Sequence, residues 1–292
     1  AYDLQEGKIF FPRPSWFSRF LPAKRKVVDV PTVIIDLIEL EFFLPFSRVK
    51  AETAIELLDI LREYCPAAVP TRFGLFEPFQ YKLETGNDKP FTKVWAKELS
   101  TAHGGSFYWQ AAAPCLGGSV SFSDRREEPP NSPSSYIRKH CLKLSFDGRA
   151  LAPGAQWTGT VVELFTKLAK RLNAFYAACY VIRNAGLENK NVVHLIGKTE
   201  SYSINTGPRW VGLSAIPTWL TWFGPGYAEL VAPHLSDCQF VKESLPSGIF
   251  LQMGPEPMNR DQLGNYPVLP DSIKRLDYKM HAEVLPQVDG FV

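Results

Sequence analysis

The sequence predicts an α+β fold in which antiparallel sheet packs against a long central helix and several short helices. Two observations favour this class: segments with a two-residue apolar alternation recur along the chain, and 161–183 repeats apolar residues at helical spacing. The 24 prolines among 292 residues predict many irregular connections, and a hydrophobic fraction of 45% is sufficient for a substantial core.

A strand followed by two helices is expected first. In 32–44, apolar side chains alternate with Glu39 and Glu41, which is typical of a strand with one buried face. In 49–64, apolar residues recur every three or four positions, which predicts a helix. A second, shorter helix is expected at 91–99.

Three strands should follow these helices. The first two, at 106–112 and 118–123, flank a turn at 114–117 that contains proline and glycine. The third, at 136–146, ends at the Asp-Gly pair 147–148, which is a common turn sequence. This part of the chain should therefore form antiparallel sheet.

The longest helix is predicted at 161–183, and it should be the central packing helix. Thr160 and Glu163 match a capping box at its start. Helical spacing is shown by Val161, Leu164, Leu168, Leu172, Phe175 and Cys179. We expect its buried face to include Leu164, Leu168, Leu172 and Phe175.

Short elements complete the predicted fold. Two short helices are expected at 217–223 and 225–230, hinged at Gly224. A hairpin is expected from 238–242 and 248–252, because a Pro-Ser-Gly turn separates these two apolar runs.

The predicted domain organisation is simple. Residues 1–30 are aromatic, basic and rich in proline, which favours an arm that packs on the rest of the protein. Residues 31–292 are interpreted as a single α+β domain. Two similar lobes, 31–150 and 151–254, followed by an extended C-terminal segment, are the alternative, because the halves weakly repeat each other.

Composition and motifs exclude several function classes. A formal net charge of +2 with 21% charged residues argues against a general nucleic-acid binder. Gly197, Lys198 and Thr199 resemble the end of a phosphate-binding loop, but Val192 stands where that loop needs a glycine. No Cys-x-x-Cys occurs, and the five histidines have no metal-ligand spacing. We therefore expect a protein that is not an enzyme, with no catalytic residue, cofactor or metal.

Cysteine usage and targeting signals favour a cytoplasmic location. The five cysteines are far apart and odd in number, which is typical of reduced thiols. Residues 1–20 lack the basic-then-apolar order of a secretory signal. No run of 18 apolar residues occurs, so a membrane-spanning helix is not expected.

Four acidic residues fall on one side of the helix expected at 49–64. This acidic stripe consists of Glu52, Glu56, Asp59 and Glu63. At about 100° per residue, these side chains lie within a band roughly 60° wide. The stripe could attract a basic partner, such as the DNA-binding surface of a nuclease. The alternative is the ordinary solvated side of an amphipathic helix.

Aromatic residues gather around Gly224. This aromatic corner consists of Trp219, Trp222, Phe223 and Tyr227. Tryptophan and tyrosine dominate binding hot spots, so Trp222 and Tyr227 are candidate partner contacts. The alternative is that these side chains fill the core, where most large aromatic residues are found.

Two short segments carry a family resemblance. Residues 73–78 read Phe-Gly-Leu-Phe-Glu-Pro, and residues 219–227 read Trp-Leu-Thr-Trp-Phe-Gly-Pro-Gly-Tyr. Together they resemble the immunity-protein-52 family of polymorphic-toxin systems, over a stretch from about 30 to 253. The order of strands, helices and hairpin is compatible with this resemblance.

The resemblance implies a cytoplasmic bacterial protein that binds and neutralises a cognate toxin and catalyses nothing. The toxin would be an effector of a type VI secretion system (T6SS), with an endonuclease domain. The expected partner is this toxin, with no direct contact to nucleic acid or membrane, and homo-oligomerisation stays open. The implied mechanism is occlusion of the toxin through a few buried anchors.

Two other function classes remain as alternatives. One is a hydrolase that uses dispersed carboxylates, and the other is an adaptor or chaperone that loads an effector. The neighbouring gene distinguishes them, because a toxin gene at that position favours immunity.

Overall fold

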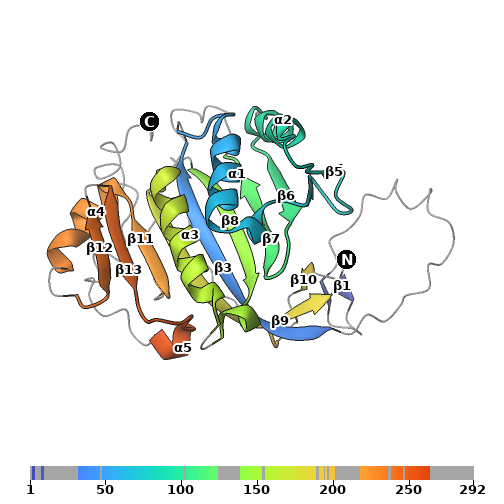
Figure 1. Cartoon of the computed structure of the whole chain (residues 1–292). Coiled ribbons are helices and arrows are strands. Elements are labelled where there is room, and N and C mark those ends of the chain that lie inside the picture. The colour runs from blue at the N-terminus through green and yellow to red at the C-terminus, as the bar shows by residue number, and fades with distance from the viewer. Residues whose placement is uncertain are drawn as a thin grey trace.

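The computed structural model is built around one large antiparallel sheet (Figure 1). The residues it describes are 2–3, 8–9, 32–46, 48–101, 103–123, 139–152, 155–188, 191–193, 195, 197–200, 218–235, 238–245 and 247–263. The strands of the sheet are β3 (Val33–Pro45), β4 (Arg72–Gly74), β5 (Tyr81–Lys82), β6 (Ser106–Gln110), β7 (Cys115–Ser121), β8 (Lys139–Asp147), β9 (Tyr176–Glu188), β10 (Asn191–Val193), β11 (Leu220–Phe223), β12 (Val241–Leu245) and β13 (Gly248–Gln252).

Hydrogen bonding arranges these strands in the order β12-β13-β11-β9-β3-β8-β7-β6-β4-β5, and β10 pairs with β9 outside this path. Each strand pair in the described residues is antiparallel. The predicted α+β class with antiparallel sheet is confirmed.

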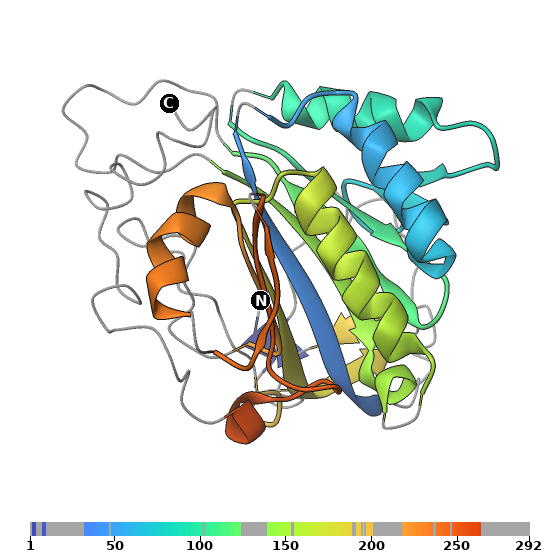
Figure 2. The ribbon, with the colours of Figure 1, turned by 60° about the vertical axis from the view of Figure 1, so that its left-hand side comes forward.

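Helices cover the sheet unequally. The described helical segments are α1 (Thr53–Tyr64), η2 (Pro66–Ala68), α2 (Lys89–Leu99), η3 (Gly148–Leu151), α3 (Trp157–Arg171), α4 (Pro225–Val231), η4 (Ala232–His234) and α5 (Arg260–Leu263). Helices α1 and α3 lie on one face of the sheet, whereas α4 lies on the other (Figure 2). We call the first the helix-side face and the second the opposite face.

Alternation along the central strand β3 separates two cores. Leu40 and Phe42 are buried in the core on the helix-side face, which also contains the buried side chains of α1, α2 and α3. Leu37 and Phe43 are buried in the core on the opposite face, together with α4. Because both faces of β3 are covered, this 13-residue strand forms the centre of the molecule.

The long helix predicted at 161–183 is wrong in its second half. Helix α3 ends at Arg171, and the chain continues as strand β9. The break is a Schellman motif: Asn173 has a φ of 54°, and the Ala174 amide donates to the Ala169 carbonyl at 2.8 Å. Asparagine tolerates this left-handed conformation better than most residues, so it ends the helix here.

The start and the buried face of this helix also differ from the expectation. The helix begins at Trp157, so the capping box predicted at Thr160 and Glu163 is wrong. The four residues predicted to form the buried face, Leu164, Leu168, Leu172 and Phe175, are all buried. Only Leu164 and Leu168 belong to the helix, however, and the other two lie at and beyond its end.

The helix predicted at 217–223 is also wrong. Its second part is strand β11, which pairs with β9 on one side and with β13 on the other. The helix expected at 225–230 is confirmed as α4, and the hairpin expected around 246–248 is confirmed as β12 and β13. The remaining predicted elements, in 32–146, correspond to β3, α1, α2, β6, β7 and β8.

Parts of the predicted organisation lie outside the described residues. Within the predicted arm 1–30, only β1 (Tyr2–Asp3) and β2 (Lys8–Ile9) are described, and they pair with each other. The segment beyond 263 also lies outside, so the division into an arm and one domain stays a prediction. Among the described residues, no helix has the length and apolar composition needed to cross a membrane.

Candidate functional site

The acidic stripe lies on α1 and the residue before it, but Arg171 neutralises part of it. Its members are Glu52, Glu56, Asp59 and Glu63. Arg171 of α3 lies 3.0 Å from Glu63 and 3.7 Å from Glu56. Arg62 lies 3.4 Å from Asp59, but it pairs mainly with Asp88, at 2.8 Å. Exposed ion pairs of this kind contribute little stability. They do, however, reduce the negative charge that the stripe presents to a partner.

The aromatic corner is part of the core. Its members Trp219, Trp222, Phe223 and Tyr227 are all buried. The Trp222 indole N–H donates to the Ala174 carbonyl at 3.0 Å, and Tyr227 packs against Phe175 and Tyr176. The prediction that Trp222 and Tyr227 contact a partner is therefore corrected, because neither side chain reaches the surface. Strand β11 is central in this half of the sheet, and both its faces are covered.

The two Phe-Gly segments are packing corners. At the second one, the Gly224 amide donates to the Phe175 carbonyl at 2.8 Å, and the backbone of Ala174 occupies the space that a side chain would need. At the first one, the Gln80 side chain lies against Gly74. Glycine is needed at Gly224, because the group that approaches it is backbone, whereas a side chain at Gly74 would displace Gln80 from its contacts with the loop.

Gln80 also organises the loop between β4 and β5. Its Oε1 accepts from the Leu75 amide at 2.9 Å, and its Nε2 donates to the carbonyls of Phe76 and Pro78 at 2.6 and 2.7 Å. One side chain therefore provides hydrogen-bond partners for three backbone groups of this loop. Helix or strand pairing does not provide partners for these groups. This holds Phe76, Glu77 and their neighbours in a defined position at the edge of the sheet.

A cluster of interacting charged and polar residues lies at the centre of the opposite face, where the sequence predicted no site. We call it the glutamate–lysine cluster: Glu39, Glu41, Lys143 and Tyr180. The Lys143 Nζ lies 3.0 Å from Oε1 of each glutamate. The Tyr180 hydroxyl donates to Glu39 at 2.6 Å and to Glu41 at 3.3 Å. Strand register explains the arrangement, because Glu41 is opposite Lys143 and Glu39 is opposite Tyr180.

Burial and charge together set the protonation of this cluster. Burial opposes the charge on Lys143, but the attraction of Glu41 and Glu39 outweighs it and raises the pKa of the ammonium group. Burial, with the charges of Glu41 and Glu39, raises the pKa of Tyr180, so this hydroxyl stays a donor. Burial also raises the pKa of the Cys141 thiol, which donates to Glu41. The cluster is therefore a fixed network at neutral pH.

A weak sequence signal for the cluster exists. The pair Glu39 and Glu41 interrupts the otherwise apolar stretch 37–45 of β3, and a stretch that is buried on both faces rarely carries two charges. Nothing in the sequence shows that Lys143 lies opposite them, because β8 is about a hundred residues away. Only the strand order supplies that information.

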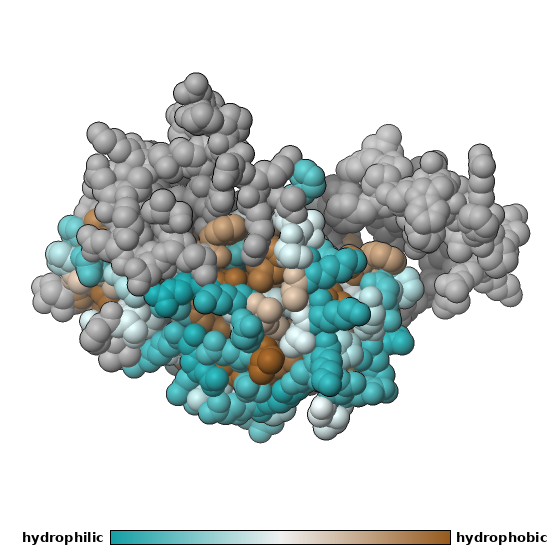
Figure 3. All heavy atoms as spheres, turned by 90° about the horizontal axis from the view of Figure 1, so that it is seen from above, coloured by the Kyte–Doolittle hydropathy of each residue, from teal (hydrophilic) through white to brown (hydrophobic). Residues whose placement is uncertain are grey.

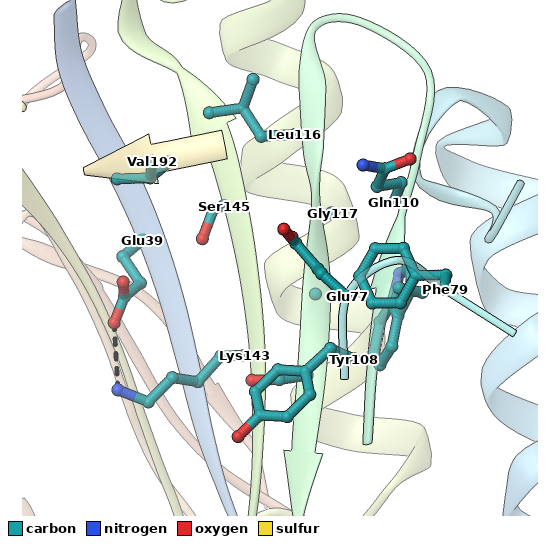
Figure 4. Close-up of a pocket in the computed structure, with 13 residues that line it drawn as sticks. Glu39, Glu77, Phe79, Tyr108, Gln110, Leu116, Gly117, Lys143, Ser145 and Val192 are labelled. Carbon is teal, nitrogen blue, oxygen red and sulfur yellow. Dashed lines mark hydrogen bonds and ion pairs between the residues drawn. The ribbon is translucent and has the colours of Figure 1, made fainter. Parts of the chain in front are cut away.

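A hollow of about 250 Å³ opens beside the cluster (Figure 4). It lies over β6, β7 and β8, between Val192 of β10 and the loop that carries Glu77 and Phe79. Glu39 and Lys143 lie at one side of it, and Tyr108 lies near the loop (Figure 4). The hollow thus combines carboxylates, one ammonium group and aromatic rings.

The cysteines offer no reactive thiol to this site. All five are free, and Cys65, Cys115 and Cys179 are buried. Burial raises the pKa of each of these three thiols, which keeps them protonated and poorly nucleophilic. Within the described ranges, no group of three His, Cys, Asp or Glu side chains is placed to hold a metal ion.

Replacing Lys143 by methionine should destabilise the protein by a similar amount at pH 5 and pH 8. Removing one partner of a buried charge pair costs about 3–5 kcal/mol. Because the Lys143 side chain is 37% exposed, solvent screening reduces the expected cost to about 1–3 kcal/mol. The free energy of unfolding, measured with urea at both pH values, tests this.

The pH dependence of this destabilisation follows from the direction in which the pKa of Lys143 is shifted. The pKa of Lys143 is raised in the folded protein, so its stabilisation is fully present below about pH 10, the ordinary lysine value, and is lost only at more alkaline pH. In the variant, the two glutamates keep the Tyr180 hydroxyl as a donor but lose the ammonium group that balances their charge. Replacing the exposed Lys82 by methionine is the control. A loss no larger than that of the control, at either pH value, would contradict the argument.

Comparison with solved structures gives a likeness in fold. No protein-family model matches the chain, and no curated protein matches it. A solved structure, described as the Pseudomonas aeruginosa T6SS protein PA0821, aligns with a TM-score of 0.50 and 12% sequence identity. The alignment covers 94% of this chain and 84% of that protein. At this identity, the likeness concerns the fold.

Proposed function

We propose that this chain is a T6SS immunity protein that binds a cognate toxin and blocks it. The observation that carries the proposal is the fold likeness to a T6SS protein over 94% of the chain. The resemblance of residues 73–78 and 219–227 to the immunity-protein-52 family supports the same function from independent evidence.

A binding function without catalysis fits the chemistry of the described residues. The glutamates of the glutamate–lysine cluster both accept from Lys143 and Tyr180, which suits a structural network better than proton transfer. The three fully buried thiols have a raised pKa, so they are poor nucleophiles. Blocking a toxin requires only a complementary surface.

Inhibition would rest on a few anchor residues. Seen from above, the described surface is mainly hydrophilic, and hydrophobic residues show in small, separate places (Figure 3). A surface of this kind binds through local hot spots, because the described residues present no broad apolar area in this view. The toxin is proposed to be a nuclease, whose basic substrate-binding surface suits acidic anchors.

The direct test is co-expression with the product of the neighbouring gene, which the proposal predicts to be the toxin. The two proteins should co-purify as a complex, and this chain should restore growth to cells that express the toxin. Growth that is not restored, despite folded protein in the cells, would overturn the proposal. Capture of the toxin without rescue would favour the alternative adaptor or chaperone.

A hydrolase remains the second candidate, because the structure brings Glu39 and Glu41 together beside the hollow. Paired carboxylates are the groups that general acid–base hydrolysis uses. Under this alternative, Glu39→Gln abolishes toxin neutralisation even when complex formation is intact. Under the immunity proposal, neutralisation follows binding in every variant.

The acidic stripe makes a kinetic prediction within the proposed function. Changing Glu52 and Asp59 together to lysine should slow toxin association several-fold at low salt and have little effect at high salt, because peripheral charges act through steering. This pair leaves the Arg171 ion pairs intact, and the Asp59 side chain is 54% exposed. Stopped-flow kinetics would measure the rates.

The matched control for this experiment changes the exposed Glu84 and Glu229 to lysine, which alters the net charge equally at other places. Association rates that fall equally in both double variants would reflect net charge alone. Unchanged rates at every salt concentration would leave the stripe as ordinary solvated surface.

A further inference from the structure

We propose that the hollow on the opposite face receives a basic side chain of the toxin, with arginine as its best occupant. This inference rests on the proposed function, because it names the place and the chemistry of toxin recognition. It is carried by three features of the hollow: its charge, its aromatic rings and its rigidity.

The charged residues that line the hollow favour a cation. They are Glu39, Glu77 and Lys143. The ammonium group of Lys143 is held 3.0 Å from Glu39 and 3.0 Å from Glu41, so its charge is already matched within the cluster. Within the cluster, the two carboxylates of Glu39 and Glu41 stand against the one ammonium group of Lys143. The net negative charge attracts a guanidinium group and repels phosphate.

Neutral hydrogen-bond acceptors add to this preference. Ser119 and Ser145 contribute hydroxyl groups, and Gln110 contributes a side-chain amide. Figure 4 shows the Glu77 carboxylate directed into the space between Ser145 and the aromatic residues. A guanidinium group has five N–H donors and no acceptor, so it can use several such groups at once.

Aromatic side chains supply the second feature. Tyr108 and Phe79 both line the hollow, and Tyr108 is 45% exposed. Cations bind over aromatic faces, and the planar guanidinium group stacks on them as well. Phe76, which is 57% exposed, lies next to Glu77 in the same loop. Exposed aromatic residues beside the hollow extend it as a surface for a protein rather than for a small molecule.

Rigidity is the third feature. Paired strands β6, β7 and β8 form the floor, and the three hydrogen bonds of Gln80 hold the loop that carries Glu77 and Phe79. A site that is ordered before binding loses less conformational entropy when it is occupied. The hollow is therefore built for one side chain that inserts from a partner, which is the usual form of a hot spot.

Titration of the full chain with two small probes tests the chemistry directly. The probes are N-acetyl-arginine amide and N-acetyl-citrulline amide, which share their shape but differ in charge. In NMR spectra, the arginine probe should shift the amide signals of Tyr108, Ser119 and Ser145. The citrulline probe should bind at least tenfold more weakly. No shift at these residues, or equal shifts with both probes, would overturn the inference.

Two variants extend the test to the toxin encoded by the neighbouring gene. Tyr108→Ala and Glu77→Gln should each weaken toxin binding at least tenfold. Tyr81→Ala, which removes a tyrosine that is also 45% exposed but does not line the hollow, should have little effect. Circular dichroism spectra would show whether each variant is folded.

The outcomes distinguish this inference from the proposed immunity function on which it rests. Equal toxin binding by Tyr108→Ala, Glu77→Gln and the unchanged chain would overturn this inference and leave the proposed immunity function standing. No toxin binding by the unchanged chain would overturn the proposed function, and the probe titration would then decide on the hollow alone.

Discussion

Replacing Gly224 by alanine is expected to destabilise the fold by about 3 kcal/mol or more, because the added methyl group has no space. An alanine Cβ at this position would lie 2.3 Å from the Ala174 carbonyl oxygen and 2.6 Å from the Phe175 Cα. Both are backbone atoms of the segment that enters β9, so they can move only if the pairing of β9 and β11 is disturbed.

The same substitution at Gly159 is the matched control. Gly159 is exposed on α3, and nothing lies within 4 Å of the Cβ that alanine would add. In a helix, this change should stabilise the protein by about 0.5–1 kcal/mol. Urea unfolding of both variants would measure the difference. Equal effects at the two positions would contradict the packing that the structure gives to Gly224.

Replacing Leu168 by alanine should cost about 2–5 kcal/mol, because the deletion leaves a cavity. Leu168 is fully buried on α3, which packs against β9, β11 and α1. A cavity between a helix and a central sheet collapses poorly, since strands on both sides hold the floor in place. The loss should appear as a lower urea midpoint with an unchanged slope.

Ile55→Ala is the control for this experiment. Ile55 is an exposed aliphatic residue of α1, so its truncation should change the free energy of unfolding by less than about 0.5 kcal/mol. A similar loss in both variants would mean that burial does not distinguish the two side chains. An unchanged urea midpoint in Leu168→Ala would contradict the packing of α3 against the sheet.

The candidate site illustrates what a single sequence can and cannot show. The acidic stripe was found because its members are close in sequence, but its neutralisation by Arg171 was not visible, since that residue lies on another helix. The glutamate–lysine cluster and the hollow draw residues from strands far apart along the chain. Strand order, which the sequence pattern does not reveal, brings them together.

For the aromatic corner, the sequence left open whether the side chains are buried or exposed. Trp222 and Tyr227 could have been surface anchors or core residues on composition alone. The pairing of β11 between β9 and β13 places Trp222 in the core on the helix-side face, and helix α4 places Tyr227 in the core on the opposite face. Because a core covers each face of the sheet here, large side chains on either face have little access to solvent.

By itself, the sequence determined the α+β class and the elements whose periodicity is local: β3, α1, α2 and the first half of α3. The end of α3 and the strands β9 and β11 were decided by the tertiary structure. Residues 172–183 have apolar spacing that fits a helix, but Asn173 turns the chain back, and β9 then hydrogen-bonds to β3 along most of its length. Hydrogen bonds to a distant strand outweigh a weak local preference, because a buried backbone must be paired.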